Sequence, residues 1–138
     1  MGDLDILIEE EDSEKARNVM EVLGYRTDHF NVNHHDHYSK GGYLVVELHR
    51  MLFVTESDSF PFFKDIWERV LPDEKSAGVY RLSHEDFYLF MNAHFEKHFH
   101  GRGSGIRSIM DFAIFLDAFG DSLDWAYIYR ELTKLGLS

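Results

Sequence analysis

Two short apolar stretches that carry acidic residues decide the fold: residues 2–8 have the sequence GDLDILI, and residues 45–48 have the sequence VVEL. Each stretch predicts a buried strand, because runs of Val, Leu and Ile are typical of strands packed on both faces. Asp3 and Asp5 are two positions apart, so their side chains lie on one face of the first strand. With Glu47 on a neighbouring strand they form an oxygen-rich set of ligands, the set that Mg²⁺ prefers.

A hairpin is predicted around the turn at residues 40–42, with arms over residues 33–39 and 42–49. Alternation along the second arm places Glu47 and His49 on one face, and the other face is purely apolar. Glu47 therefore lies in the middle of a strand and not on a solvated turn.

The remaining segments are predicted from their spacing and from their start and stop residues. Apolar residues recur at helical spacing after Ser13, and Gly24 ends that pattern. Ser83 followed by acidic residues is a strong helix start. The predicted elements are a helix over 13–23, a short strand over 25–30, a helix over 61–70, an extended segment over 79–82, and helices over 83–100, 106–119 and 122–135, the last capped by Asp121 or Ser122.

Composition limits the class of protein. The chain has 138 residues with 44% hydrophobic residues, which predicts a single α+β domain, strand-rich over residues 1–60 and helical over residues 61–138. Its 25 acidic and 14 basic residues give a net charge of −11, which argues against binding of long nucleic acid. It has no cysteine and no apolar run long enough to span a bilayer. We therefore expect a cytoplasmic protein without a membrane partner.

Several motifs resemble a known group of proteins. The first strand, the helix end at Leu23-Gly24-Tyr25 and the sequence VELH at residues 46–49 resemble the polymerase-beta-like nucleotidyltransferase superfamily. Later motifs are similar to one branch of it, the uncharacterised nucleotidyltransferases: LSHED at 82–86, HFEKH at 94–98, IRSIMD at 106–111 and LDW at 123–125. The resemblance covers essentially the whole chain. It implies a mixed sheet with flanking helices, followed by a C-terminal helical bundle.

The resemblance also implies an activity. Members of this superfamily transfer a nucleoside monophosphate from a nucleoside triphosphate to a hydroxyl acceptor, using two Mg²⁺ (or Mn²⁺) ions. By this resemblance Asp3 and Asp5 bind both ions, and Glu47 binds the ion on the side of the nucleophile and accepts its proton. The acceptor cannot be identified from the sequence.

The superfamily further has a Gly-Ser turn upstream of its Asp-x-Asp strand, where backbone N–H groups bind the triphosphate. Because the sequence begins two residues before Asp3, we expect either a truncated product of a longer gene or a lost grip on the nucleotide, and in both cases no transfer by this chain alone. A partner chain, for example in a homo-oligomer, would then have to supply the Gly-Ser element. The alternative from a different class is a non-catalytic binding or assembly module with a degenerate nucleotidyltransferase fold.

Three further positions are candidates for binding. His49 is expected to contact substrate phosphate or to orient Glu47, and Arg107, which follows a glycine-rich segment, is a candidate anion ligand. Residues 34–37, with the sequence HHDH, suggest either a zinc site or a solvated polar arm of the hairpin. On a regular strand His35 and His37 would share one face, and His34 and Asp36 the other. A solvated polar arm is the more common case and is the favoured interpretation.

Overall fold

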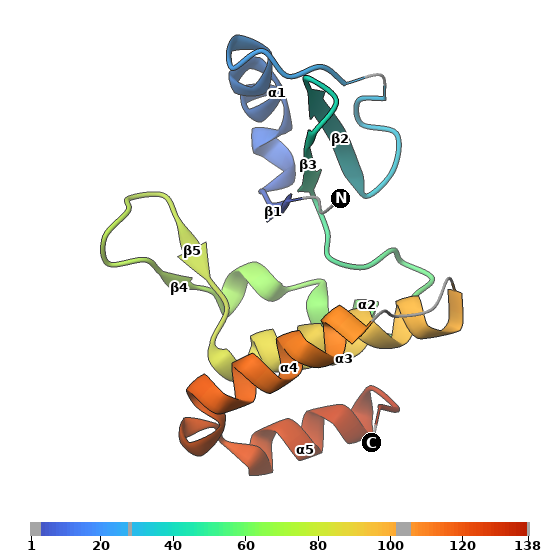
Figure 1. Cartoon of the computed structure of the whole chain (residues 1–138), viewed down its shortest axis with the longest axis vertical. Coiled ribbons are helices and arrows are strands. Elements are labelled where there is room, and N and C mark those ends of the chain that lie inside the picture. Colours follow the sequence, from blue (N-terminus) through green and yellow to red (C-terminus); the bar gives the residue numbers. More distant parts are fainter. Residues whose placement is uncertain (1–3, 28, 102–105, 138) are drawn as a thin grey trace. The chain divides into compact units, whose positions relative to one another are not determined.

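The computed structural model describes residues 4–27, 29–101 and 106–137, and only the backbone of residues 98–101 and 107. The chain forms two units, Met1–Lys64 and Asp65–Ser138, coloured blue to green and green to red in Figure 1. The first unit carries the larger sheet and the second carries the helical bundle, so the α+β class is confirmed. That the two units act as a single domain stays a prediction.

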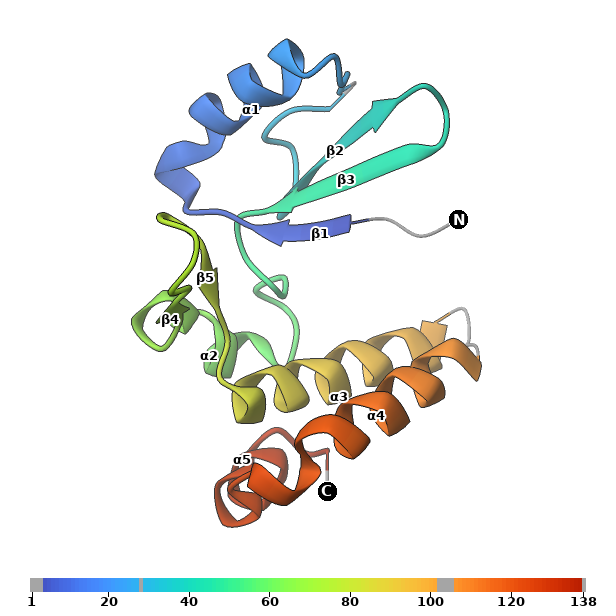
Figure 2. The same cartoon turned by 60° about the vertical axis from the view of Figure 1, so that its left-hand side comes forward.

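A three-stranded mixed sheet forms the centre of the first unit. Its strands are β1 (Leu4–Leu7), β2 (His35–Lys40) and β3 (Leu44–His49), in the order β1-β3-β2. β1 runs parallel to β3, and β2 runs antiparallel to it. Figure 2 shows the three strands side by side with a helix along one face. This arrangement confirms the predicted mixed sheet.

The turn of the β2–β3 hairpin depends on two glycines. Gly41 and Gly42 have φ angles of 62° and 76°, in the left-handed region that residues with a Cβ rarely adopt. The predicted hairpin is therefore confirmed, and its turn is built by the residues expected to build it.

Helix α1 (Ser13–Val22) covers one face of this sheet, after a short 3₁₀ turn, η1 (Glu10–Asp12). Met20 of α1 packs with Tyr38, Val46 and Leu48, all of which are buried. The helix ends at Gly24, whose φ is 83°, so the predicted helix and its glycine stop are confirmed.

The prediction that β1 is buried was wrong. Leu4, Asp5 and Ile6 are all exposed. β1 is the edge strand and has a neighbour only on the β3 side, and the buried cluster under α1 is formed by β2 and β3. The apolar composition of residues 4–8 identified a strand correctly but not its place in the sheet.

The predicted strand over residues 25–30 was also wrong, because the described residues of this segment, 25–27 and 29–30, pair through one bridge. The Arg26 N–H donates to the Ser39 carbonyl and the Ser39 N–H donates back, both at 2.9 Å. A few residues later Asn31 has a φ of 57°, and its N–H donates to Asp36 Oδ1 at 2.7 Å. The Asp36 carboxylate thus takes a backbone donor that a longer strand would have used for pairing.

Residues 61–70 do not form the predicted continuous helix. They contain α2 (Phe60–Phe63) and a 3₁₀ turn, η2 (Ile66–Glu68), separated by Asp65, whose ψ of 31° lies outside the helical region. The chain then forms a two-stranded ribbon of β4 (Leu71–Pro72) and β5 (Tyr80–Arg81), of which only the second strand was expected.

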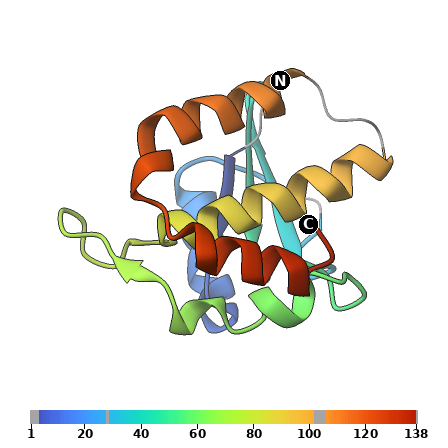
Figure 3. The same ribbon diagram turned by 90° about the horizontal axis from the view of Figure 1, so that it is seen from below.

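Three longer helices form the second unit: α3 (His84–Gly101), α4 (Ile106–Phe119) and α5 (Trp125–Lys134). Figure 3 shows α3 between α4 and α5. The predicted helix start is confirmed, because Ser83 Oγ accepts a hydrogen bond from the Asp86 N–H at 3.0 Å. Within the described ranges, no helix combines the length and apolar composition needed to cross a bilayer.

The predicted cap of the last helix was wrong. Asp124, and not Asp121 or Ser122, caps α5 by accepting a hydrogen bond from the Tyr127 N–H at 3.0 Å. Ser122 instead donates to the carbonyl of Phe119 at 2.8 Å and closes the 3₁₀ turn η3 (Gly120–Ser122).

A buried carboxylate holds the second unit together. Asp86 accepts hydrogen bonds from the Tyr127 hydroxyl at 2.8 Å and from Arg69 Nε at 3.1 Å. Burial, and then the hydrogen bond to Asp86, raise the pKa of Tyr127. These contacts join α3 to α5 and to the segment after η2.

Candidate functional site

The register of the first sheet brings its chemically active side chains to one face. Asp5 on β1 lies directly opposite Glu47 on β3, and His35 on β2 lies opposite His49 on β3. Paired residues project to the same side of a sheet, and so do residues two positions apart. These four side chains therefore lie on the face opposite to α1, because the residues between them, such as Leu48, point into the core.

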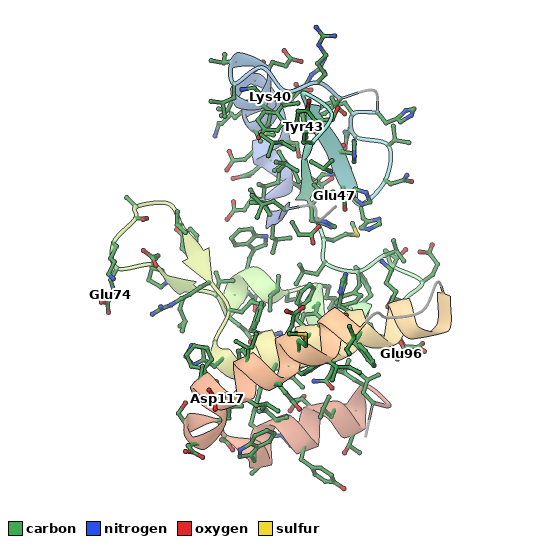
Figure 4. The ribbon with its side chains drawn as sticks, viewed as in Figure 1. Lys40, Tyr43, Glu47, Glu74, Glu96 and Asp117 are labelled. Atoms are coloured by element: carbon green, nitrogen blue, oxygen red, sulfur yellow. The ribbon has the colours of Figure 1, made fainter. Side chains whose placement is uncertain are left out.

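His49 links the two carboxylates. Its Nε2 lies 3.0 Å from Asp5 Oδ1 and 3.4 Å from Glu47 Oε2. The side chains of Glu47 and His49 are 20% and 15% exposed, whereas that of Asp5, on the edge strand, is 51% exposed. Figure 4 labels Glu47 on β3, away from Lys40 and Tyr43 at the turn of the hairpin. The carboxylate pair is thus open to solvent on the Asp5 side.

The partners of His49 determine its tautomer. Ionised carboxylates only accept hydrogen bonds, so the Nε2 atom between Asp5 and Glu47 carries a proton. The other ring nitrogen, Nδ1, is enclosed and has no hydrogen-bond partner among the described residues. A neutral His49 ring therefore has a lone pair on an enclosed atom that the fold does not use.

A buried ion pair positions the segment before β2. Arg50 Nη1 donates to Asp36 Oδ2 at 2.6 Å, and Arg50 Nη2 donates to the carbonyl of Asn33. The backbone N–H of Arg50 also donates to the carbonyl of His34 at 2.9 Å. These contacts fix residues 33–36 against the end of β3, where His49 lies.

His34 and His35 both lie near His49, contrary to the prediction that they take opposite faces. The ring centroids are 4.4 Å apart for His34 and His35, 5.7 Å for His34 and His49, and 4.9 Å for His35 and His49. β2 begins at His35, so His34 precedes the strand and strand alternation does not govern its direction. His35 also approaches the carboxylates, with its Nε2 atom 3.6 Å from Glu47 Oε2.

Among the residues that the structure describes, there are two groups of potential metal ligands, each with ligand atoms within 4.8 Å of one another: Asp5, Glu47 and His49, and His34, His35 and His49. The first group fits a divalent cation bound through oxygen, because its two carboxylates project side by side from neighbouring strands. The second group consists of imidazoles only.

Of the residues expected at the site, the structure brings together Asp5, Glu47 and His49. Asp3 and the side chain of Arg107, which belongs to α4 of the second unit, lie outside the described residues. The sequence interpretation missed that His35 lies beside Glu47. Counting residues back from the Gly41–Gly42 turn would have shown that His35 pairs with His49.

Comparison with known proteins gives one match. The model of a family described as uncharacterised nucleotidyltransferase matches residues 1–138. No curated protein and no solved structure matches the chain.

Proposed function

This chain belongs to the uncharacterised nucleotidyltransferase family, and from this premise we propose that it transfers a nucleoside monophosphate from a nucleoside triphosphate to a hydroxyl acceptor with the help of a divalent cation. The observation that best supports the proposal is the pairing of Asp5 with Glu47 across β1 and β3. A side-by-side pair of carboxylates that share a contact with the His49 imidazole suits a divalent cation, which carries more positive charge than the imidazole.

In this proposal Asp5 and Glu47, together with Asp3, hold Mg²⁺ or Mn²⁺. When bound, the cation neutralises phosphate charge and lowers the pKa of the attacking hydroxyl. His49 keeps Asp5 and Glu47 together, because its Nε2–H reaches oxygen atoms of both. This role agrees with the expectation that His49 orients Glu47.

Glu47 is the residue placed to receive the acceptor's proton. Its carboxylate is more enclosed than that of Asp5, and the His35 imidazole beside it is placed to carry a proton away. In the reaction the acceptor oxygen forms a bond to the α-phosphorus, the bond from that phosphorus to the bridging oxygen breaks, and pyrophosphate leaves. The proton of the hydroxyl passes to Glu47.

A binding experiment tests this proposal. Isothermal titration of the full chain with Mn²⁺ and nonhydrolysable analogues of the four ribonucleoside triphosphates is expected to show binding of one analogue that depends on the cation. Asp5→Asn is expected to weaken it by at least about tenfold, since a metal ligand is removed. Glu14→Gln, which removes an exposed carboxylate of α1, is the matched control and is expected to leave it unchanged. Binding that survives Asp5→Asn unchanged would contradict the proposal.

One observation favours the alternative, a binding or assembly module without transfer activity. Ile106, Ile109, Met110 and Ile114 of α4 are exposed and follow helical spacing. Contiguous exposed apolar side chains mark interaction surfaces, and this stripe suits a second copy of the chain. Light scattering would then show a dimer that Ile109→Lys dissociates and the off-stripe control Asp111→Lys does not. A monomer without nucleotide affinity would contradict both proposals.

A further inference from the structure

We propose that His34, His35 and His49 form a second metal site, next to the carboxylate pair, for a transition-metal ion of the Zn²⁺ type. One ligand atom of each ring lies within 4.8 Å of those of the other two. The site is independent of the proposed transfer reaction, because it needs neither a nucleotide nor Asp3.

The spacing of the first two rings suits a common ion. His34 Nε2 and His35 Nδ1 are 3.1 Å apart. A tetrahedral Zn²⁺ with Zn–N bonds of about 2.0–2.1 Å separates two nitrogen ligands by about 3.3–3.4 Å. Without an ion the same two nitrogens share one hydrogen bond. If the two nitrogens move slightly apart, a metal ion takes the place of the shared proton.

His49 has the arrangement that metal-binding histidines adopt. Its Nε2–H donates to the Asp5 carboxylate at 3.0 Å, which leaves the lone pair on Nδ1. A carboxylate that accepts from the second ring nitrogen fixes the tautomer and raises the basicity of the first. The enclosed Nδ1 atom has no hydrogen-bond partner in the part of the chain that the structure describes, and Nδ1 is therefore assigned as the ligand atom of His49.

The backbone holds the three rings before any ion arrives. His34 accepts a hydrogen bond from the Arg50 N–H at 2.9 Å, and the Arg50 guanidinium holds Asn33 and Asp36 on either side of the two histidines. His35 and His49 are paired across β2 and β3. A preformed set of ligands loses less conformational entropy on binding, which favours affinity.

The donor set selects the metal. Imidazole nitrogen suits Zn²⁺, Ni²⁺ and Cu²⁺, whereas Mg²⁺ prefers oxygen ligands. Three protein ligands leave a fourth position open, as in catalytic zinc sites, and Glu47 Oε2 lies 3.6 Å from His35 Nε2, next to the group. The two groups share His49, so they form adjoining sites with different metal preferences.

Zinc titration of the full chain tests the proposal, with Zn²⁺ alone competing against a chromophoric chelator at pH 7.5. We expect one equivalent to bind, and His34→Ala and His35→Ala each to weaken binding by at least about tenfold. His37→Ala is the matched control, because His37 lies on the same strand and is exposed. It is expected to leave zinc affinity unchanged. Co²⁺ in place of Zn²⁺ is expected to give visible absorption bands of a four-coordinate site that His34→Ala removes.

Three results would overturn the proposal. In the first, the wild-type chain shows no saturable binding of Zn²⁺, and this result does not depend on whether any variant folds. Zinc affinity could survive both His34→Ala and His35→Ala, which would place the ion on Asp5, Glu47 and His49 alone. Loss in His37→Ala equal to that in His34→Ala would make the effect nonspecific. None of these results bears on nucleotide binding, so failure here is distinguishable from failure of the transfer proposal.

Discussion

Both faces of the first sheet carry acidic residues, but the negative charge of these residues is balanced by different groups on the two faces. On the face against α1, Asp36 is 1% exposed and is matched by the Arg50 guanidinium and the Asn31 N–H. On the other face Asp5 and Glu47 contact imidazoles. A carboxylate held by a buried guanidinium stabilises the fold, whereas carboxylates that contact imidazoles at a partly open site can bind a cation.

The difference arises from residues that are close in sequence. Asp36 lies next to His35 on β2, and Leu48 lies between Glu47 and His49 on β3. Since successive side chains of a strand point to opposite faces, each strand contributes one residue to the core and the next to the candidate site. Stability and binding can therefore be changed separately by substitutions at neighbouring positions.

The largest effect on stability is expected from Asp36→Ala. This change leaves the guanidinium of Arg50 buried without its partner, which should lower the free energy of unfolding of the first unit by about 3–5 kcal/mol. Because Trp67 and Trp125 both belong to the second unit, the change should be followed by hydrogen exchange of the β2 and β3 amides and not by tryptophan fluorescence.

The control for that experiment is Asp12→Asn, which breaks the exposed pair of Asp12 with Lys15. An exposed pair contributes less than about 1 kcal/mol, so the loss should be small. If Asp36→Ala and Asp12→Asn lower the free energy of unfolding equally, Asp36 does not have the structural role that distinguishes it from the carboxylates of the other face.

Leu48→Ala is expected to have the next largest effect. Leu48 is buried against Met20 and Tyr38, and truncating a buried leucine lowers the free energy of unfolding by about 2–5 kcal/mol. Val45→Ala changes a half-buried residue of the same strand on the candidate-site face and should cost less. Urea unfolding followed by far-UV circular dichroism measures both, and a larger loss from Val45→Ala would reverse the assignment of the two faces.

Most of this comparison was predictable from local sequence. The Gly41-Gly42 turn and the alternation of β3 placed Glu47 and His49 on one face and Val46 and Leu48 on the other, because the side-chain period of a strand is fixed. The start of α3 followed from Ser83, a capping residue that acts within one turn, whereas the cap of α5 was misassigned by a few residues.

The errors concern contacts between residues far apart in the chain. Apolar composition could not show that β1 is an edge strand, since the order of strands depends on the whole unit. The start of β2 depended on Asp36, whose carboxylate binds the Asn31 N–H and the Arg50 guanidinium. His34 precedes the strand for the same reason, so its side chain does not follow strand alternation. The three-histidine group therefore could not be assembled from spacing along the chain.

Tyr38→Phe is expected to raise stability slightly. The Tyr38 ring is 0% exposed, and its hydroxyl has no hydrogen-bond partner among the residues that the structure describes. Burial, and then the nearby Asp36 carboxylate, raise the pKa of Tyr38, so the hydroxyl is neutral at pH 7. Removing an unsatisfied buried hydroxyl should increase the free energy of unfolding by about 1 kcal/mol. Tyr43→Phe, at an exposed position of the hairpin turn, is the control, and a loss of stability in Tyr38→Phe would indicate an unseen partner on the core face.

The smallest effect on stability is expected from Glu47→Gln. This variant is the most direct test of the difference between the two faces. The glutamine keeps an oxygen that accepts from His49 but removes the repulsion between the carboxylates of Glu47 and Asp5, so the free energy of unfolding should change by less than about 0.5 kcal/mol. Cation-dependent nucleotide binding should be lost in the same variant, because a carboxylate ligand is removed. Urea unfolding and isothermal titration on one preparation measure both quantities. A loss of several kcal/mol would mean that Glu47, like Asp36, is held for the fold, and the contrast between the structural face and the binding face would then fail.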